Sequence, residues 1–287
     1  MKTYQQLWQS LTPLYDAGEA QAIVRTVLDV KYGMTLTDII GGKVNELSSD
    51  EETKLEEIVC RLQKGEPVQY VLGYETFCGR TFAVRPGVLI PRPETEGLIQ
   101  LMHSLGSREK PAPRILDIGT GSGCIAITAA LDMAGADVTA WDISEEALAT
   151  AEENASTLGA RVRFVRQDAL RPPEDEALWD FVVSNPPYIC MKERAEMSRN
   201  VLDHEPATAL FVPDDDPLVF YRSIARYARR ALRDGGWLLF EINPLYDGDM
   251  TAMMAEEGFE GTETYDDIFG RRRFAAAQRQ DSGPATA

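Results

Sequence analysis

The sequence has few of the residues that bind metal ions or form disulfides. It contains 4 cysteines and 2 histidines among 287 residues. The cysteines, Cys60, Cys78, Cys124 and Cys190, are far apart and form no Cys-x-x-Cys pair, so neither disulfides nor a zinc site is expected. With so few histidines, a histidine-based metal site is not expected either. The sequence therefore predicts free thiols, no metal cofactor and a cytoplasmic protein.

Positive charge and long apolar runs are also scarce. Lysine and arginine total 29 against 46 aspartates and glutamates, which gives a formal net charge of −17 at pH 7. Nonspecific nucleic-acid binding needs a basic surface, so we expect no direct nucleic-acid partner. The charge is compatible with a basic protein partner, or it serves solubility alone. The chain has no apolar run of about 18 residues and its first residues lack a signal-peptide core, so no membrane association is expected.

The first part of the chain has helical periodicity and no catalytic motif. Apolar residues recur at helical spacing between Leu7 and Leu62. Two patterns indicate helix starts within it, namely Thr37-Asp38 and the pair Ser49 and Glu52. Residues 1–73 are predicted to form a small helical domain. Residues 74–90 contain two strand-like segments around a turn and are predicted to form a connecting β-hairpin.

Residues 91–278 alternate between strand and helix patterns after an initial helix. The strand candidates are 114–118, 137–141, 162–166, 181–184 and 237–242, and the helix candidates are 124–133, 145–158 and 218–232. Such alternation predicts an α/β fold with a doubly wound, mostly parallel sheet whose sites lie at the carboxyl ends of the strands. Residues 274–277 are interpreted as a final edge strand, and residues 279–287 as a disordered tail.

A glycine-rich turn joins the first of these strands to a helix. It has the pattern Asp117-x-Gly119-x-Gly121-x-Gly123, whose glycines let the backbone turn tightly and approach a ligand closely. The Gly-x-Gly-x-x-Gly spacing of dinucleotide enzymes is absent. The spacing is similar to the first motif of S-adenosylmethionine-dependent methyltransferases. That resemblance implies that Asp117 and the turn, including Thr120 and Ser122, hold the methionine part of this cofactor.

Two aspartates follow the next two strands. Asp142 lies 23 residues after Gly119, where a carboxylate can accept hydrogen bonds from both ribose hydroxyls. Asp168, with Ala169 beside it, lies where such enzymes bind the adenine amino group. The alternative is that both aspartates only cap strand ends. Their order at successive strand ends favours a nucleoside site.

The motif Asn185-Pro186-Pro187-Tyr188 follows a fourth apolar strand. An amide nitrogen is a poor nucleophile because its lone pair is delocalised. The Asn185 side-chain carbonyl and the Pro186 main-chain carbonyl can accept both of its hydrogens, which would orient the lone pair toward a sulfonium methyl. Pro187 stiffens the backbone, and Tyr188 presents a face for stacking a planar group. Asn185 would thus contact both substrate and cofactor, and the motif predicts methyl transfer to a planar nitrogen.

Together these motifs resemble those of the glutamine-N5 methyltransferases of peptide chain release factors, the PrmC/HemK family. Further segments match that family, namely 85–96, 117–126, Glu205-Pro206-x-x-Ala209-Leu210 and Gly235-Gly236. With the helical first domain, the resemblance covers residues 1 to about 278. It implies a substrate-recognition role for residues 1–73 and, as substrate, the glutamine in the Gly-Gly-Gln loop of class I release factors. It also implies S-adenosylmethionine as cofactor, with S-adenosylhomocysteine as product. We expect a monomer.

Some positions have more than one interpretation. Arg92 and Glu94 either line the mouth of the active site and contact substrate or form a structural ion pair. His103 and His204 are interpreted as surface or packing residues. Residues 271–273, three consecutive arginines, are interpreted as a solvated turn, or as contacting an acidic surface. Residues 241–246 depart from the Glu-x-Gly pattern that is usual in the family, so we expect loop shape and partner contacts to differ there.

Three rival functions remain open from the sequence. One is a glutamine methyltransferase that acts on a ribosomal protein. Another is an adenine amino-methyltransferase, which the net charge and the absence of a basic target-recognition segment disfavour. The third is a noncatalytic protein-binding platform, which the intact glycine turn, Asp142 and Asn185 disfavour.

Overall fold

The computed structural model describes residues 2–106 and 112–280, and these divide into two compact units. One unit holds the chain up to Tyr74 together with Met197–Glu205. The other holds Glu75–Glu196 and the chain from Pro206 onward. Sequence analysis assigned 197–205 to the second domain, whereas in the structure this segment groups with the helical unit. Residues 279–287 were predicted to form a disordered tail, and 281–287 lie outside the described residues. Arg279 is described, and its backbone N–H donates to the Gly236 carbonyl at 2.8 Å.

The first unit is helical, as predicted. Its elements are α1 (Tyr4–Gln9), α2 (Ala17–Tyr32), α3 (Leu36–Ile40), the 3-10 helix η1 (Lys43–Glu46), α4 (Ser49–Gln63), α5 (Val68–Leu72) and, from the later segment, α9 (Arg199–His204). One apolar core joins α1 through Leu7, α2 through Leu28 and α4 through Leu62. In this unit His204 makes a packing contact, with Nε2 3.4 Å from the Lys64 carbonyl oxygen.

The predicted helix caps in this unit are displaced by one or two residues. Ser48 caps α4 and forms a capping box with Glu51, and Thr35 does the same for α3 with Asp38. Each capping residue has extended backbone angles and accepts a hydrogen bond from the N–H three residues on, which is the geometry a cap requires. Two adjacent serines, or two nearby threonines, both satisfy the sequence pattern, so only backbone geometry distinguishes them.

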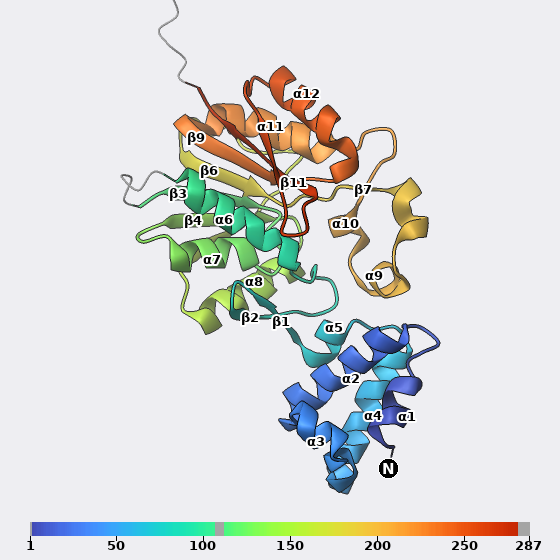
Figure 1. The fold of residues 1–287 in the computed structure, drawn as a ribbon. Helices are drawn as coiled ribbons and strands as arrows, with labels where there is room; N and C mark the ends of the chain where they lie inside the picture. The colour runs from blue at the N-terminus through green and yellow to red at the C-terminus, as the bar shows by residue number, and fades with distance from the viewer. Residues whose placement is uncertain (1, 107–111, 281–287) are drawn as a thin grey trace, which may run out of the picture. The chain divides into compact units, whose positions relative to one another are not determined.

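The second unit is an α/β fold around a seven-stranded sheet (Figure 1). The strands are β3 (Arg114–Ile118), β4 (Asp137–Asp142), β5 (Val162–Arg166), β6 (Trp179–Ser184), β9 (Leu232–Glu241), β10 (Glu263–Asp266) and β11 (Arg272–Gln278), in the order β10-β11-β9-β6-β3-β4-β5. β3, β4, β5, β6 and β9 pair in parallel, and β11 pairs antiparallel with both β9 and β10. The doubly wound, mostly parallel sheet is therefore confirmed.

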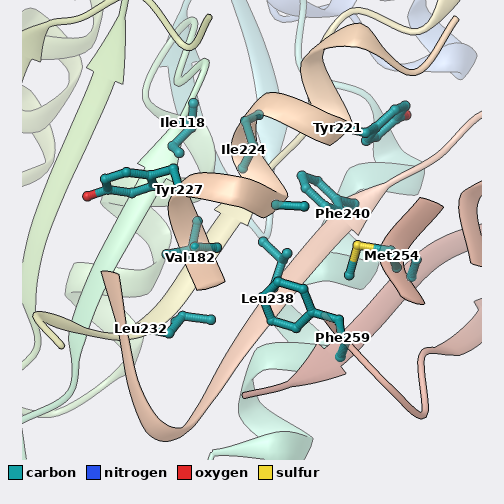
Figure 2. Close-up of a cluster of buried hydrophobic side chains, with 14 of the residues drawn as sticks. Ile118, Val182, Tyr221, Ile224, Tyr227, Leu232, Leu238, Phe240, Met254 and Phe259 are labelled. Atoms are coloured by element: carbon teal, nitrogen blue, oxygen red, sulfur yellow. The ribbon is translucent and has the colours of Figure 1, made fainter. Parts of the chain in front are cut away.

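Helices cover both faces of this sheet. They are α6 (Glu96–Leu105), α7 (Cys124–Asp132), α8 (Glu145–Leu158), α11 (Val219–Ala231) and α12 (Asp247–Glu256). Side chains alternate between two apolar cores, since Val182 and Leu238 pack with α11 and α12 whereas Val183 and Leu239 pack with α6 and α7. Figure 2 shows the first of these cores, where Tyr221, Ile224 and Tyr227 of α11 meet the sheet.

Smaller elements complete this unit. They are the hairpin β1 (Tyr74–Phe77) and β2 (Arg80–Ala83), the pair β7 (Ile189–Cys190) and β8 (Phe211–Val212), the helix α10 (Ala207–Leu210), and the 3-10 helices η2 (Pro93–Thr95), η3 (Met191–Glu196) and η4 (Pro244–Tyr246). The hairpin, and α6 as the helix before the first strand of the sheet, follow the prediction.

All four cysteines are free. In the described part of the chain, no helix has the length and apolarity needed to cross a membrane.

The interpretation of residues 274–277 as an edge strand is wrong. They belong to β11, which is paired on both sides, and the edge position is taken by β10, which sequence analysis did not identify. Phe274, Ala275 and Ala276 are accordingly buried on both faces of the sheet. A continuous apolar run of this kind is typical of a strand inside a sheet rather than at its edge.

Two helical glycines give a test of this packing. A Cβ added at Gly97 in α6 would lie 2.4 Å from the Phe274 ring, whereas one at Gly248 in α12 would meet nothing within 4 Å. We expect Gly97→Ala to lower the free energy of unfolding by about 1–3 kcal/mol, because the ring or the helix must move. The matched change Gly248→Ala should raise it by up to about 1 kcal/mol. Urea denaturation measures both, and equal losses would contradict the packing of α6 on β11.

Candidate functional site

One cavity of about 540 Å³ lies at the carboxyl ends of the parallel strands, entirely within the second unit. The backbone register explains why the predicted motifs meet there. Ile118 pairs with Trp141 of β4 and with Ser184 of β6, so Gly119, Asp142 and Asn185 each follow one row of the sheet. The Ser184 hydroxyl donates to the Ile118 carbonyl at 2.6 Å, which ties β6 to β3 at this end.

Most of the predicted site residues line this cavity. Those that do are Gly119, Thr120, Gly121, Ser122, Asp142, Asp168, Ala169, Asn185, Pro186, Pro187 and Arg92. Four others, Asp117, Gly123, Tyr188 and Glu94, are not among the lining residues. The roles assigned to individual residues remain predictions. Of the four outside the cavity wall, Asp117, Gly123 and Tyr188 make structural contacts, and Glu94 acts on Glu241 through its charge.

Asp117 lies beneath the glycine turn and is completely buried. Its Oδ2 accepts hydrogen bonds from the Thr120 hydroxyl at 2.6 Å and from the Ala126 N–H at 3.2 Å, while Oδ1 has no hydrogen-bond partner. Burial raises the pKa of Asp117 to about 7, with the charge of Asp142 acting in the same direction and the two hydrogen bonds opposing it. The carboxyl group therefore links the glycine turn to the first residues of α7 through these two hydrogen bonds.

The three glycines of the turn have different roles. Gly119 and Gly121 have φ of +77° and +57° and line the cavity, where positive φ costs least for glycine. At Gly123 a Cβ would lie 2.8 Å from the Ile127 side chain and 3.0 Å from that of Ala151. Gly123 therefore allows α7 and α8 to approach each other, rather than contacting the cavity.

Asp142 presents a largely buried carboxylate to the cavity. Its Oδ2 accepts from the Gly121 N–H and its Oδ1 from the Ser144 N–H, both at 2.9 Å. Burial raises the pKa of Asp142, and these backbone hydrogen bonds oppose the shift. Each oxygen retains a lone pair for a further donor.

Asp168 and its neighbours form the next part of the wall. Asp168 Oδ1 accepts from the Leu170 N–H at 2.8 Å, and Oδ2 lies 4.0 Å from Arg171 Nε. Ile143 and Leu170 line the cavity although both are exposed large apolar residues. An acidic group flanked by open apolar side chains is suited to a purine ring, which has both a flat apolar face and polar edges.

The Asn-Pro-Pro-Tyr segment is held from behind. The Asn185 Nδ2 group donates to the Thr95 hydroxyl oxygen at 3.4 Å, and the Tyr188 hydroxyl donates to Glu241 Oε1 at 3.1 Å. Burial raises the pKa of Tyr188 above its usual range, and the Glu241 charge adds to this effect. Tyr188 packs against the core on the α11 side of the sheet, so its predicted stacking on a substrate stays a prediction.

Sequence analysis missed Thr95 and Glu241. Thr95 lies in the family-like 85–96 segment, but the sequence analysis assigned it no individual role. Glu241 ends β9 and is 1% exposed. Burial raises its pKa and the negative charge of Glu94 adds to the shift, while its hydrogen bonds and the Arg273 charge lower it. Two signals were available for Glu241, namely a carboxylate at the end of an apolar strand and its match to the glutamate of the Glu-x-Gly family pattern.

The 241–246 segment contacts the substrate motif directly. Asn243 Nδ2 donates to the Tyr188 carbonyl at 3.2 Å and to Glu193 Oε2 at 3.1 Å, and Glu193 Oε1 accepts from the Cys190 N–H at 2.8 Å. A glycine at this position could make none of these side-chain contacts. Asn243, which replaces the usual glycine, therefore connects the segment after β9 to the loop that follows Tyr188.

The three arginines do not form a simple solvated turn. Arg272 and Arg273 begin β11, and Arg273 is largely buried, with Nε 3.3 Å from Asp267 Oδ2. Its charge acts on both Glu241 and Tyr188. Of the three arginines, only Arg271, which is exposed and precedes β11, fits the predicted solvated turn. Among the described residues, no group of three His, Cys, Asp or Glu side chains is arranged to hold a metal ion.

Comparisons with family models match both parts of the chain. The description "PrmC N-terminal domain" matches residues 13–73, and "Methyltransferase small domain" matches residues 82–208. Among solved structures, a methyltransferase from Pyrococcus furiosus has a TM-score of 0.52 at 15% identity and covers 82% of this chain and 100% of its own. A 16S rRNA methyltransferase from Thermus thermophilus, in complex with AdoMet and guanosine, also has a TM-score of 0.52, at 19% identity, and the match covers 72% of this chain and 50% of its own. These similarities show the methyltransferase fold.

Full-length relatives carry a more specific description. A release factor glutamine methyltransferase from Bacteroides thetaiotaomicron is 48% identical over 94% of this chain and 97% of its own length. Proteins of the same description from Flavobacterium psychrophilum and Bacillus subtilis are each 36% identical, over 95% and 96% of this chain and 97% and 98% of their own lengths. With this identity over nearly the whole length, and with the predicted motifs brought to one cavity, the chain belongs to the release factor glutamine methyltransferase family.

Proposed function

We propose that this enzyme transfers a methyl group from S-adenosylmethionine to the side-chain amide nitrogen of the glutamine in the Gly-Gly-Gln loop of a class I release factor. One observation carries the proposal. The glycine turn, the Asp142 carboxylate and the Asn185 amide line a single cavity, so a cofactor held by the first two would lie next to the third. The names of the full-length relatives supply the substrate class.

The residues of the cavity fit the cofactor chemically. Asp142 would accept hydrogen bonds from the ribose hydroxyls, and Asp168 from the adenine amino group. The positive-φ turn at Gly119 and Gly121 leaves room for the methionine part, since neither position carries a Cβ. When bound, S-adenosylmethionine supplies an electrophilic methyl group on a sulfonium. The acidic groups Asp117 and Asp142 would favour its positive charge over the neutral product.

Asn185 and Pro186 would act on the substrate amide. Their carbonyl oxygens accept its two N–H hydrogens, which orients the nitrogen and localises its lone pair toward the methyl group. The amide nitrogen would form a bond to the methyl group as the bond from that methyl group to sulfur breaks, and the nitrogen would then release one proton to solvent. The surrounding wall contributes apolar side chains such as Phe220 and Ile224, which exclude water from the reacting atoms.

We also propose that the helical unit, residues 1–73, recognises the protein substrate. It has its own apolar core and none of the cavity residues. The net charge of −17 would favour a basic protein partner over a polyanion.

The direct test is methyl transfer from labelled cofactor to a purified class I release factor. Label should enter the wild-type factor and not a variant in which the glutamine of the Gly-Gly-Gln loop is replaced. A ribosomal protein and a DNA duplex serve as parallel acceptors. Label on either of these but not on the release factor would refute the assigned substrate while keeping the chemistry.

The assigned roles predict that a substitution at Asn185 lowers turnover, whereas a substitution at Asp142 weakens cofactor binding. Asn185→Ala should lower kcat by at least about 100-fold with a cofactor Kd within about threefold of wild type, because it removes an acceptor for the substrate amide. Asp142→Ala should weaken cofactor binding about 10- to 100-fold, because it removes hydrogen bonds to a charged group. Calorimetric titration and steady-state kinetics measure both. Equal losses of cofactor affinity in the two variants would contradict the assignment.

Cofactor affinity should increase with pH. Since burial raises the pKa of Asp117 to about 7, this carboxyl is partly protonated below neutrality in the absence of a cation, and burial shifts the pKa of Asp142 in the same direction. A cationic cofactor binds the ionised forms more tightly, so binding releases protons and Kd falls as pH rises from about 5.5 to 7.5, by up to about tenfold per pH unit for one released proton. Asp117→Asn should flatten this slope. An unchanged slope in that variant would rule out Asp117 as the titrating group.

A further inference from the structure

A chain of two hydrogen bonds leads from a buried carboxylate to the substrate motif. The Thr95 hydroxyl donates to Glu241 Oε2 at 2.6 Å, and Asn185 Nδ2 donates to the Thr95 oxygen at 3.4 Å. Thr95 and Glu241 are only 3% and 1% exposed. Glu241 comes from the end of β9, Thr95 from the start of α6 and Asn185 from the turn after β6. Three separate segments therefore converge behind the amide of Asn185.

The first hydrogen bond gives the second a direction. A hydroxyl carries one hydrogen, and that of Thr95 is used by the carboxylate, which is acceptor-only when ionised. The Thr95 oxygen can then only accept from Asn185, so it selects the NH2 end of the amide. The carbonyl oxygen Oδ1 is left on the other end of the amide of Asn185, which is one of the residues that line the cavity.

An asparagine amide has no such preference by itself. Its oxygen and nitrogen are nearly equal in size, so a rotation of the amide by about 180° exchanges them with little steric change. In the rotated orientation two acceptor oxygens would face each other at Thr95, and an NH2 group would face the NH2 group of a substrate. Only one of the two orientations can accept a hydrogen from the substrate nitrogen.

We propose that Thr95 is a positioning residue that, oriented by Glu241, holds the Asn185 amide with its oxygen toward the substrate. This inference rests on the proposed function and extends it by naming what sets the orientation of the substrate acceptor. Glu241 uses its other oxygen, Oε1, to accept from the Tyr188 hydroxyl, so the same carboxylate anchors both ends of the Asn-Pro-Pro-Tyr motif.

The alternative role of Thr95 as a helix cap does not account for its contacts. Thr95 occupies the N-cap position of α6, but its side chain makes no cap hydrogen bond and its backbone angles are helical. Its hydroxyl is directed to Glu241 instead. A carboxylate buried to this degree costs free energy unless it is well compensated, and here Thr95, Tyr188 and the Arg273 charge compensate it.

The kinetic test compares two substitutions at one position. Thr95→Val keeps the shape and removes the hydroxyl, whereas Thr95→Ser keeps the hydroxyl and removes a methyl group. We expect Thr95→Val to lower kcat about 10- to 100-fold with a cofactor Kd near wild type, because the amide populates the unproductive orientation. Its melting temperature should fall, because Glu241 loses a hydrogen-bond donor, so kcat is measured well below that temperature. Thr95→Ser should stay within about threefold of wild type. Full activity in Thr95→Val, or equal kcat losses in the two variants, would overturn the proposal.

A second measurement does not depend on the methyl acceptor. The side-chain NH2 of Asn185 gives proton–nitrogen NMR signals, which can be assigned by their absence in Asn185→Asp. One of its two protons should exchange with water at least about tenfold more slowly than the other in wild type and in Thr95→Ser, because it is hydrogen-bonded to Thr95. In Thr95→Val the two rates should become similar. Equal rates in the wild type would refute the positioning role.

The two readouts separate the inference from the function on which it rests. If the wild-type enzyme transfers no methyl group to the release factor, the assigned substrate is wrong, and the exchange rates still decide whether Thr95 orients Asn185. If the wild type is active and Thr95→Val is equally active, the positioning role alone fails.

Discussion

The hydrogen-bond register of β3 with its two neighbours is the constraint on which the site depends. Ile118 pairs with Trp141 on one side and with Ser184 on the other, so the three strands are in register at this end of the sheet. The residues that follow, Gly119, Asp142 and Asn185, belong to segments far apart in the sequence. A slip of one residue in either pairing would turn the side chains of that strand to the opposite face and separate the cofactor turn from the substrate motif.

Buried acidic groups surround the cavity, and this arrangement has an electrostatic consequence. Asp117, Asp142 and Glu241 all have raised pKa values, with burial as the largest cause in each. Such groups are costly in the absence of a compensating charge. Asp117 and Asp142 receive backbone N–H groups, and Glu241 receives hydroxyl groups and the Arg273 charge. Asp142 thus presents its carboxylate to the cavity, whereas Asp117 and Glu241 make their hydrogen bonds inside the protein.

The second half of the substrate motif is anchored by contacts that the motif itself does not contain. Tyr188 donates to Glu241, and its carbonyl accepts from Asn243, in the segment that departs from the usual family pattern. An asparagine in place of glycine adds side-chain hydrogen bonds to the Tyr188 carbonyl and to Glu193. The Asn-Pro-Pro-Tyr segment of this protein is therefore held from both β9 and the turn after it.

Much of the fold followed from the sequence because its signals are local. The strand at 114–118, the helix at 145–158 and the order of the motifs depend on hydrophobic periodicity and turn residues that lie within a few positions of one another. Errors arose where a local pattern is compatible with two structures. Ser48 and Ser49 are equally good caps by composition, and the apolar run in β11 does not state how many neighbours the strand has.

The sequence by itself determined the α/β class, because hydrophobic periodicity is local, and its motifs supplied the family resemblance and the candidate residues of the glycine turn, Asp142 and Asn185. Only the tertiary structure decided which of these residues reach the cavity and which support it. Asp117, Gly123 and Tyr188 lie inside the motifs yet make packing or hydrogen-bond contacts behind the wall. Thr95 and Glu241 are separated by 146 residues, and their hydrogen bond exists only because α6 and β9 are brought together by folding.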